Sequence, residues 1–239
     1  AESIKFYKSS SYVSHGDKKG FFFDTIYGTI KWLNIHNKLR ILSLHTKLNK
    51  HLDIGCGTGD FLKYLNRKGA STTGIETDDD ARSTALNKKL TVFRTLTDAP
   101  TAQYTSITMI HVLEHVHQLQ QYLTFITEHL EEKGILFLAL PNYLSHDAKY
   151  YKEYWAGYDA PRHLYHFQPK SVEIIAKDFG LKLVRQYPMK FDSYYVSLLS
   201  HQYASGKTNY LKAFLEGFKS NWKARKTGNF SSLIYILQK

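Results

Sequence analysis

The sequence has one cysteine, Cys56, so no disulfide can form within the chain. A chain without a disulfide framework is typical of reducing compartments, and we expect a cytoplasmic location. No apolar run approaches the roughly 20 residues that a membrane-spanning helix needs. The first residues, AESIKFYKSS, also lack the charged-then-apolar pattern of a secretory signal.

Long runs of like charge are absent too, although the overall charge is unbalanced. The chain carries 32 Lys and Arg against 21 Asp and Glu, a formal net charge of +11. A basic balance suits nucleic acid, an anionic membrane or an anionic substrate. Because the lysines are scattered rather than gathered in one run, we do not expect nucleic acid as a partner.

Apolar residues are plentiful, at 43% of the 239 residues, which is enough for the core of one large α/β domain. From residue 51 onward, short apolar segments alternate with amphipathic ones. We expect strands at 51–55, 71–76, 90–95, 106–112, 134–140, 181–191 and 232–239, and helices at 59–68, 78–88, 118–132 and 171–179. This alternation predicts an α/β fold with a doubly wound, seven-stranded and mostly parallel sheet.

Three segments fall outside this alternation. Residues 1–24 resemble an irregular arm, and residues 25–48 have the spacing of one or two helices. Residues 142–168 are an aromatic, His-rich loop. We therefore divide the chain into an N-terminal arm with cap helices, a core, and a helical insertion or lid before the last strand, at 1–48, 49–191 with 231–239, and 192–230.

The strongest motif is Leu52-Asp53-Ile54-Gly55-Cys56-Gly57-Thr58-Gly59, which follows an apolar strand and opens a helix. In a doubly wound sheet a ligand lies at the carboxyl ends of the strands, and glycines there let the backbone approach it closely. Glu76 ends the second strand, where an acidic side chain can accept hydrogen bonds from ribose hydroxyls. The pairing of the loop with this acid predicts a nucleoside-containing cofactor.

The spacing of the glycines narrows the choice of cofactor. A dinucleotide fingerprint, G-x-G-x-x-G, brings a helix N-terminus onto a pyrophosphate, but position 60 here is Asp. An Asp facing a pyrophosphate would repel it, which disfavours a nicotinamide oxidoreductase. S-adenosyl-L-methionine has no phosphate and carries a cationic amine, with which Asp53 and Asp60 are compatible.

The motifs resemble those of class I S-adenosylmethionine-dependent methyltransferases. LDIGCGTGDFL is similar to the first motif of that family, TGIETD to its ribose-binding acid, TMIHVLEHVHQLQQYL to its fourth strand and EEKGILFLALPN to its fifth. The similarity runs from about residue 50 to 190, and WAGYDAPRHLYHFQPKSV looks like a subgroup of bacterial small-molecule methyltransferases. One departure is Tyr104-Thr105, where the family usually has Phe-Asp, and we expect it to be structural.

The resemblance implies a Rossmann-like methyltransferase fold and S-adenosyl-L-methionine as cofactor. It places the cofactor against the glycine loop, the acid and the adenine side, at Asp53, Gly55, Cys56, Gly57, Gly59, Glu76, Thr77, Leu96 and His111. Family members also fold an N-terminal arm over the cofactor. Tyr12 and His15 are therefore candidates for contact with its methionine end.

Methyl transfer from a sulfonium is an in-line displacement, in which the protein aligns the acceptor and excludes water. A general base helps when the acceptor is a hydroxyl, and histidine suits this role near neutral pH. His111, His115 and His163 are the candidate catalytic residues, and Tyr158, Arg162 and His163 the candidate acceptor-binding residues. His115 with Glu114 could instead hold its loop by hydrogen bonds.

A metal site at His111 and His115 would need a helix that brings both onto one face. The two residues span a strand end and a loop, so we expect no metal site.

The sequence also lacks two nucleic-acid methyltransferase signatures. No Asn/Asp-Pro-Pro-aromatic tetrapeptide follows the fourth strand, and the only Cys lies in the cofactor loop rather than at a nucleophile position. The sequence thus predicts methyl transfer to a small-molecule O- or N-acceptor. An RNA or protein methyltransferase and a non-catalytic S-adenosylmethionine-binding domain remain as alternatives.

The insertion carries large apolar residues at helical spacing, interleaved with lysines: Tyr210, Leu211, Phe214, Leu215, Phe218 and Trp222. The pattern predicts an amphipathic basic helix. We expect its apolar face to pack on the body of the protein or on a second protomer. The alternative is that the insertion covers the acceptor pocket and admits an apolar or lipid-linked acceptor at a membrane surface.

Overall fold

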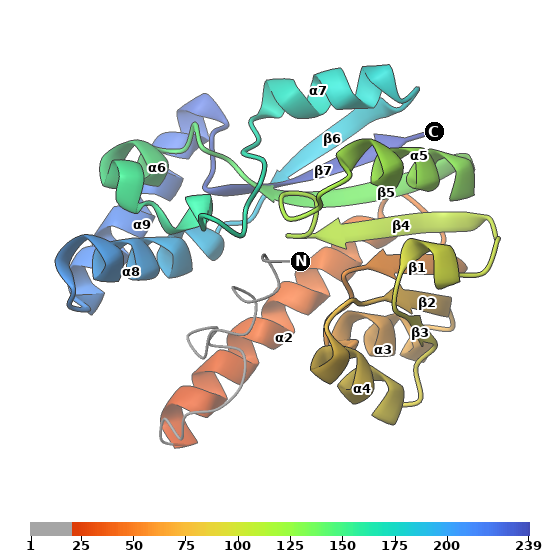
Figure 1. Ribbon diagram of the computed structural model, residues 1–239. Coiled ribbons are helices and arrows are strands. Elements are labelled where there is room, and N and C mark those ends of the chain that lie inside the picture. The colour runs from red at the N-terminus through yellow and green to blue at the C-terminus, as the bar shows by residue number, and fades with distance from the viewer. Residues whose placement is uncertain (1–20) are drawn as a thin grey trace.

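The computed structural model describes the backbone of residues 21–239 and the side chains of residues 32–239. Tyr12 and His15 lie outside the described residues. A seven-stranded sheet with strand order β3-β2-β1-β4-β5-β7-β6 crosses the molecule (Figure 1). β7 is antiparallel to both of its neighbours, whereas the other neighbouring strands pair in parallel. The predicted α/β sheet of seven mostly parallel strands is confirmed.

The strands lie close to their predicted positions: β1 Lys50–Ile54, β2 Ser71–Ile75, β3 Val92–Phe93, β4 Tyr104–Ile110, β5 Leu130–Pro141, β6 Lys182–Pro188 and β7 Ser232–Gln238. β3 is much shorter than predicted, because it pairs only with Gly74 and Ile75 of β2. β5 begins earlier than predicted, since Leu130 pairs with the fully buried Tyr104.

The helices are α2 Phe21–Ser43, α3 Asp60–Arg67, α4 Asp79–Asn87, α5 Leu119–His129, α6 His146–Tyr151, α7 Pro169–Asp178, α8 Asp192–Ser205 and α9 Tyr210–Thr227. The prediction of an irregular arm through residue 24 is wrong for residues 21–24, which open α2. The predicted loop 142–168 contains α6 and two short 3-10 turns. The insertion is helical, as predicted, and forms the α8–α9 pair.

Both faces of the sheet are covered by helices. One core cluster joins Leu123 of α5 and Val172 of α7 to the sheet, and the other joins Leu39 of α2 and Phe61 of α3 to the opposite face. Strands buried on both faces are continuously apolar, as in β5, where residues 135–140 are all buried. This packing leaves the carboxyl ends of the strands as the place for a ligand.

The α8–α9 pair packs through small residues rather than through the large ones. A Cβ on Gly217 of α9 would lie 2.9 Å from the Cα of Tyr194 in α8, so only glycine permits this close approach. Ala213, Ser220 and Ala224 are buried along the same face of α9. The two helices and the 142–168 segment form one group beside the sheet (Figure 1).

The prediction that the large apolar face of α9 packs on the body is therefore wrong. Phe218 and Trp222 are 53% and 57% exposed, and the other large residues of this face are also exposed, namely Tyr210, Leu211, Phe214 and Leu215. Because the small side chains of α9 allow a closer contact with α8, the small-residue face is buried and the aromatic face points outward. Among residues 21–239, no helix is long and apolar enough to cross a membrane.

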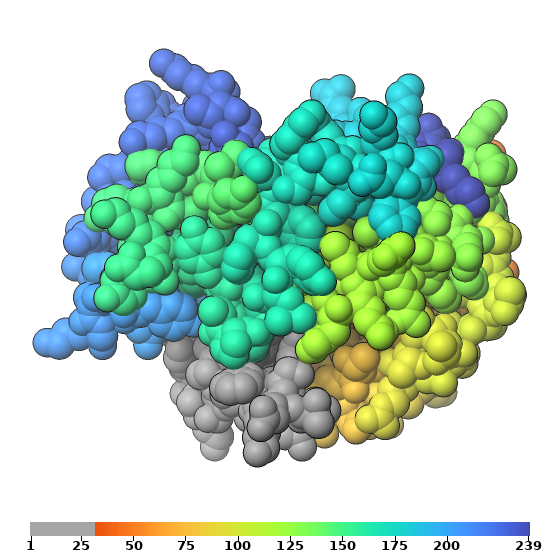
Figure 2. Space-filling view, turned by 45° about the horizontal axis from the view of Figure 1, so that its top comes forward, coloured from red at the N-terminus to blue at the C-terminus, as the bar shows by residue number. Residues whose placement is uncertain are grey.

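Asp147 of α6 links the α8–α9 pair and the 142–168 segment to the sheet by hydrogen bonds. Its buried carboxylate accepts hydrogen bonds from Ser220 Oγ in α9 at 2.5 Å, Trp155 Nε1 at 2.8 Å and Ser231 Oγ at 2.7 Å. Buried carboxylates are tolerated when donors satisfy their oxygens in this way. Figure 2 shows the 142–168 segment, in green to teal, lying between the blue α8–α9 pair and the yellow-green β4–α5 region.

Candidate active site

The glycine loop joins β1 to α3 and is built on three glycines with positive φ, 75° at Gly55, 54° at Gly57 and 76° at Gly59. Gly55 and Gly59 are also needed for packing, since a Cβ there would lie 2.2 Å from a methyl group of Val112 and 2.4 Å from one of Leu90. A Cβ on Gly57 would meet no atom of the described chain within 4 Å. Among the described residues, nothing therefore fills the space beside the Gly57 backbone.

Cys56, predicted to touch the cofactor, points its side chain the other way. Its Sγ is buried with Leu62, Ala85 and other apolar residues between α3 and α4, and burial raises the pKa of the thiol. Only the backbone of Cys56 lies on the side of the loop where the cofactor is expected.

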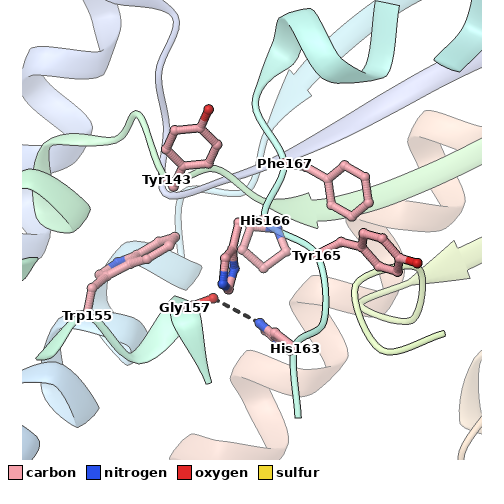
Figure 3. Close-up of a pocket in the computed structure, with 8 residues that line it drawn as sticks. Tyr143, Trp155, Gly157, His163, Tyr165, His166 and Phe167 are labelled. Carbon is pink, nitrogen blue, oxygen red and sulfur yellow. Dashed lines mark hydrogen bonds between the residues drawn. The ribbon is translucent and has the colours of Figure 1, made fainter. Parts of the chain in front are cut away.

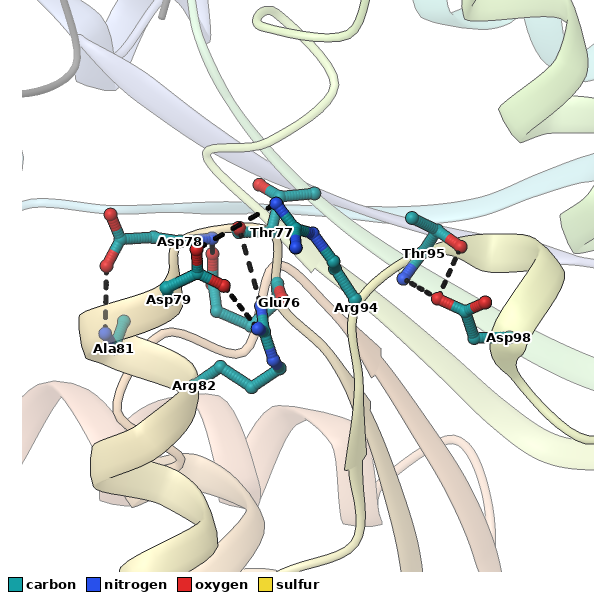
Figure 4. Close-up of polar contacts among 9 residues, drawn as sticks. All are labelled: Glu76, Thr77, Asp78, Asp79, Ala81, Arg82, Arg94, Thr95 and Asp98. Carbon is teal, nitrogen blue, oxygen red and sulfur yellow. Dashed lines mark hydrogen bonds and ion pairs between the residues drawn. The ribbon is translucent and has the colours of Figure 1, made fainter.

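Glu76 follows β2 directly and holds the glycine loop. Its Oε2 accepts a hydrogen bond from the Gly57 amide at 2.8 Å, and its Oε1 accepts one from the Asp78 amide at 2.9 Å. Each carboxylate oxygen keeps a second lone pair for another donor. Figure 4 shows this carboxylate beside the start of α4, where Asp78 caps the helix by accepting from the Ala81 amide.

Thr77 and Leu96 were also predicted to contact the cofactor. Thr77 is exposed, and its carbonyl accepts from Arg82, which also donates to the Glu76 carbonyl at 3.0 Å. Leu96 is buried in a short 3-10 turn, 96–98, that is closed by hydrogen bonds between Thr95 and Asp98 (Figure 4).

Asp53 lies inside the sheet below the loop. Its Oδ1 accepts from the Thr108 hydroxyl at 2.5 Å, and the Thr108 oxygen lies 3.1 Å from His51 Nε2. Burial raises the pKa of Asp53 to about 7, although the Thr108 hydrogen bond and the charge of Lys38 oppose this. Asp53 is 3% exposed, so any effect on a bound cation is electrostatic rather than by contact.

Asp60 contributes less to cofactor choice than its sequence position suggests. Its carboxylate pairs with Lys88 Nζ at 2.7 Å and accepts from the Thr58 hydroxyl at 3.2 Å. Because Lys88 compensates its charge, Asp60 cannot by itself repel a pyrophosphate. The argument from position 60 against a dinucleotide therefore rests on the missing glycine alone.

His111 ends β4 and lies between two carboxylates. Its Nδ1 is 3.5 Å from Glu114 Oε1, and its Nε2 is 3.3 Å from Asp192 Oδ2, at the first residue of α8. Burial alone would lower the pKa of His111, but the carboxylates of Asp192 and Glu114 outweigh it and raise the pKa to about 9. His111 is thus an imidazolium at neutral pH, which does not suit a general base.

His115 and His163 come from two loops and meet with their ring centroids 4.4 Å apart. His163 Nδ1 is 2.9 Å from the Gly157 carbonyl, and its Nε2 is 4.0 Å from Glu114 Oε1. Burial lowers the pKa of His163, so it is neutral near pH 7 and can accept a proton. Compared with His111, His163 therefore has the more suitable charge state for a base.

Of the three candidate acceptor residues, only His163 lines the small pocket beside the 142–168 segment. His163 lines it together with Pro141, Tyr143, Trp155, Gly157, Tyr165, His166 and Phe167 (Figure 3). Tyr158 packs edge-on against Trp155 and His166 at the side of this pocket. Arg162 pairs with Asp159, and its carbonyl is 3.1 Å from His115 Nδ1. Arg162 is thus engaged in a salt bridge within the domain.

The structure thus brings His111, His115 and His163 together around Glu114, at the carboxyl end of β4. Sequence reasoning missed Asp192, which reaches this cluster from the insertion. Its only signal was its position as the first polar residue after the sixth strand, and no spacing rule links it to His111.

The geometry fits S-adenosyl-L-methionine. An open backbone at Gly57 lies next to a carboxylate whose two oxygens each retain a lone pair, which matches the two hydroxyls of a ribose.

Relatives of known name share this region. The chain is 31% identical over 134 residues to a ubiquinone biosynthesis O-methyltransferase of Glaesserella parasuis, covering 48% of this chain and 57% of that protein. It is 29% identical over 129 residues to the protein of the same name from Methylococcus capsulatus, covering 48% and 54%. The chain spans about half the length of the curated relatives it matches.

Solved structures share the fold. The crystal structure of an S-adenosylmethionine-dependent methyltransferase from Archaeoglobus fulgidus superposes with a TM-score of 0.61 at 16% identity, covering 92% of this chain and all of that one. The methyltransferase domain family, which uses S-adenosyl-L-methionine, matches residues 31–186, well over half of the chain. The chain therefore belongs to the family of S-adenosylmethionine-dependent methyltransferase domains.

Proposed function

We propose that this protein transfers the methyl group of S-adenosyl-L-methionine to a small-molecule acceptor by in-line displacement. The observation that supports the proposal is the contact between Gly57 and Glu76, because it holds the acid that we expect to bind the ribose beside the glycine backbone. The bound cofactor would supply an activated methyl group. Glu76 would hold the ribose and the Gly57 backbone would allow the ligand to approach.

An oxygen acceptor is favoured over a nitrogen one. The curated relatives of this chain are named as O-methyltransferases. A hydroxyl acceptor must lose a proton during transfer, and a neutral histidine can take it. His163 meets this requirement better than the positively charged His111, and it lines the pocket of Figure 3.

The test separates donor binding from transfer. Isothermal titration with S-adenosylmethionine, with its demethylated product and with NAD should give a dissociation constant on the order of micromolar for the first two only. Incubation with methyl-labelled donor and a small-molecule metabolite extract should then yield a labelled product.

The outcomes distinguish the alternatives. Binding without transfer to metabolites, RNA or protein would indicate a non-catalytic cofactor-binding domain. Labelled RNA or protein would reject the small-molecule acceptor while keeping the methyltransferase. No binding of the donor would reject the proposal as a whole.

A second proposal concerns where the acceptor is met. We propose that the outward face of α9 docks on an anionic membrane surface and gives access to an apolar or lipid-linked acceptor. Phe214, Phe218 and Trp222 are 53% to 57% exposed on this face, and lysines and arginines lie among them: Lys212, Lys219, Lys223, Arg225 and Lys226. Exposed aromatics with interleaved cations are typical of helices that lie in the interface of a bilayer.

Liposome co-sedimentation tests the docking. Vesicles with anionic lipid should sediment the protein at low salt and less of it at high salt, because charge attraction is screened. Trp222→Ser should weaken sedimentation, whereas Ile174→Ser should not, although Ile174 of α7 is similarly exposed at 51%. Absence of sedimentation at low salt would reject the docking but leave the donor-binding test untouched.

A further inference from the structure

Three potential metal ligands from two loops converge at the end of β4. One ligand atom from each of Glu114, His115 and His163 lies within 4.8 Å of the other two. Glu114 and His115 follow β4, while His163 comes from the 142–168 segment. The sequence analysis considered a metal site at His111 and His115. In this trio His163 takes the place of His111, and no helix is needed to align the ligands.

The carboxylate of Glu114 is the feature that calls for a ligand. It is 1% exposed, and neither of its oxygens has a hydrogen-bond partner among the described residues. The imidazolium of His111 balances the charge of this carboxylate from 3.5 Å, but that distance is longer than an ordinary hydrogen bond. A buried carboxylate without donors is costly, and a bound cation is one of the ways in which proteins compensate it.

The two histidines are oriented as metal ligands usually are. His163 Nδ1 lies 2.9 Å from the Gly157 carbonyl (Figure 3), and His115 Nδ1 lies 3.1 Å from the Arg162 carbonyl. A carbonyl only accepts, so in the neutral rings the proton is on Nδ1 and the lone pair is on Nε2. Backbone carbonyls fix the tautomer of metal-bound histidines in the same way.

We propose that Glu114, His115 and His163 form a binding site for a divalent transition-metal cation of the zinc type. Two imidazoles and one carboxylate are a ligand set for zinc or a similar borderline cation rather than for magnesium, which prefers oxygen. Three protein ligands leave a coordination position for water or another oxygen ligand. The cation would also join the 142–168 segment to the end of β4. A cation on Nε2 of His163 takes up the lone pair that accepts a proton in the proposed function, so the base role of His163 applies only to the metal-free chain.

The required movement is small. Tetrahedral donors about 2.1 Å from zinc lie roughly 3.4 Å apart, so donors now within 4.8 Å would close by about an ångström. We expect rotation of the Glu114 side chain to supply this movement, because rotation of the rings would break the Nδ1 contacts to the Gly157 and Arg162 carbonyls. Asp159 Oδ2, 3.8 Å from His163 Nε2, lies near enough to affect the site electrostatically.

Direct metal titration tests the site without reference to methyl transfer. The full chain, stripped with a chelator and dialysed, is titrated with Co²⁺ while its visible absorption is followed, and with Zn²⁺ by calorimetry. We expect a single equivalent of either metal to bind. His163→Ala, His115→Ala and Glu114→Gln should each weaken binding by about 10- to 100-fold or more.

Matched controls keep the result specific. His166→Ala and His117→Ala remove exposed histidines three and two residues from the proposed ligands and should leave the affinity unchanged. Circular dichroism shows whether each variant is folded, and Glu114→Gln keeps the shape of the side chain if a histidine variant is not. No binding of Co²⁺ or Zn²⁺ by the wild-type chain, or equal affinity in Glu114→Gln, would overturn the proposal.

Discussion

The amide of Gly57 donates a hydrogen bond to Oε2 of Glu76 across 2.8 Å, although 19 positions separate the two residues in the chain. The contact joins the turn after β1 to the end of β2. Since parallel strands end at the same edge of a sheet, it brings the two halves of the predicted cofactor site together.

Replacing Glu76 with Ala should weaken S-adenosylmethionine binding by about 1–3 kcal/mol, because the amides of Gly57 and Asp78 and the ribose hydroxyls all lose their acceptor. Isothermal titration measures the loss. Asp80→Ala is the matched control, since Asp80 is an exposed acid four residues away. An unchanged dissociation constant in Glu76→Ala would remove this acid from the site.

Substitution of Gly57 by Val should abolish donor binding while the protein stays folded. The new Cβ would meet no other described atom within 4 Å, so the side chain would extend into the space beside the loop where the ligand is expected. Gly69→Val is the control, because Gly69 also has positive φ and open space but lies at the end of α3, and both variants carry similar backbone strain. Equal effects on binding in the two variants would assign the loss to strain rather than to blocked access.

Asp53 should make the fold less stable as the pH rises. The pKa of Asp53 is about 7 in the fold and about 3.8 when the side chain is free. Between these values the folded chain keeps a proton that the unfolded chain has lost. The stability contributed by the protonated form is complete below about pH 4 and is lost as the pH rises through 7, by at most about 4 kcal/mol.

Urea unfolding at pH 5 and pH 8 measures the larger part of this loss, which falls between pH 5 and 7. In Asp53→Asn the difference between the two pH values should shrink, since Asn can still accept from Thr108 but does not titrate. Asp80→Asn serves as the exposed control. The same pH difference in Asp53→Asn and wild type would show that other groups cause it.

Much of the fold could be predicted from the spacing of apolar residues and from the turn residues. Less of the candidate site could be predicted in this way. The run from Leu136 to Leu140 is buried on both faces, so its continuous apolar character gave the strand directly. Glu76 could be placed because a strand end fixes its position in a parallel sheet. Asp192 and His163 could not be placed together with His111, because each arrives on a segment whose path depends on tertiary packing.

Packing of the large apolar face of α9 on the body was predicted wrongly for a similar reason, whereas its packing on a second protomer stays a prediction. Spacing showed that Phe214, Phe218 and Trp222 share one side of the helix, and hydrophobicity suggested that this side would be buried. The close contact at Gly217 against Tyr194 reversed the choice, since helices approach most closely through small residues. Spacing alone identifies two faces and does not tell which of them finds a partner.

Deleting residues 205–226 should leave donor binding intact and reduce turnover on the order of 100-fold. Gly57 and Glu76 lie on other elements, whereas α9 supports α8, whose Asp192 contacts His111 at 3.3 Å. Binding by calorimetry and turnover with labelled donor are measured separately.

Because the deletion also removes the hydrogen bond from Ser220 to Asp147, a milder variant is tested beside it. Gly217→Val forces α9 away from α8, and Lys226→Val places the same side chain on an exposed site of α9. Gly217→Val should lower turnover in the same direction, and Lys226→Val should not. If turnover survives in both the deletion and Gly217→Val, the insertion is not the acceptor lid, and the 142–168 segment shapes the pocket alone.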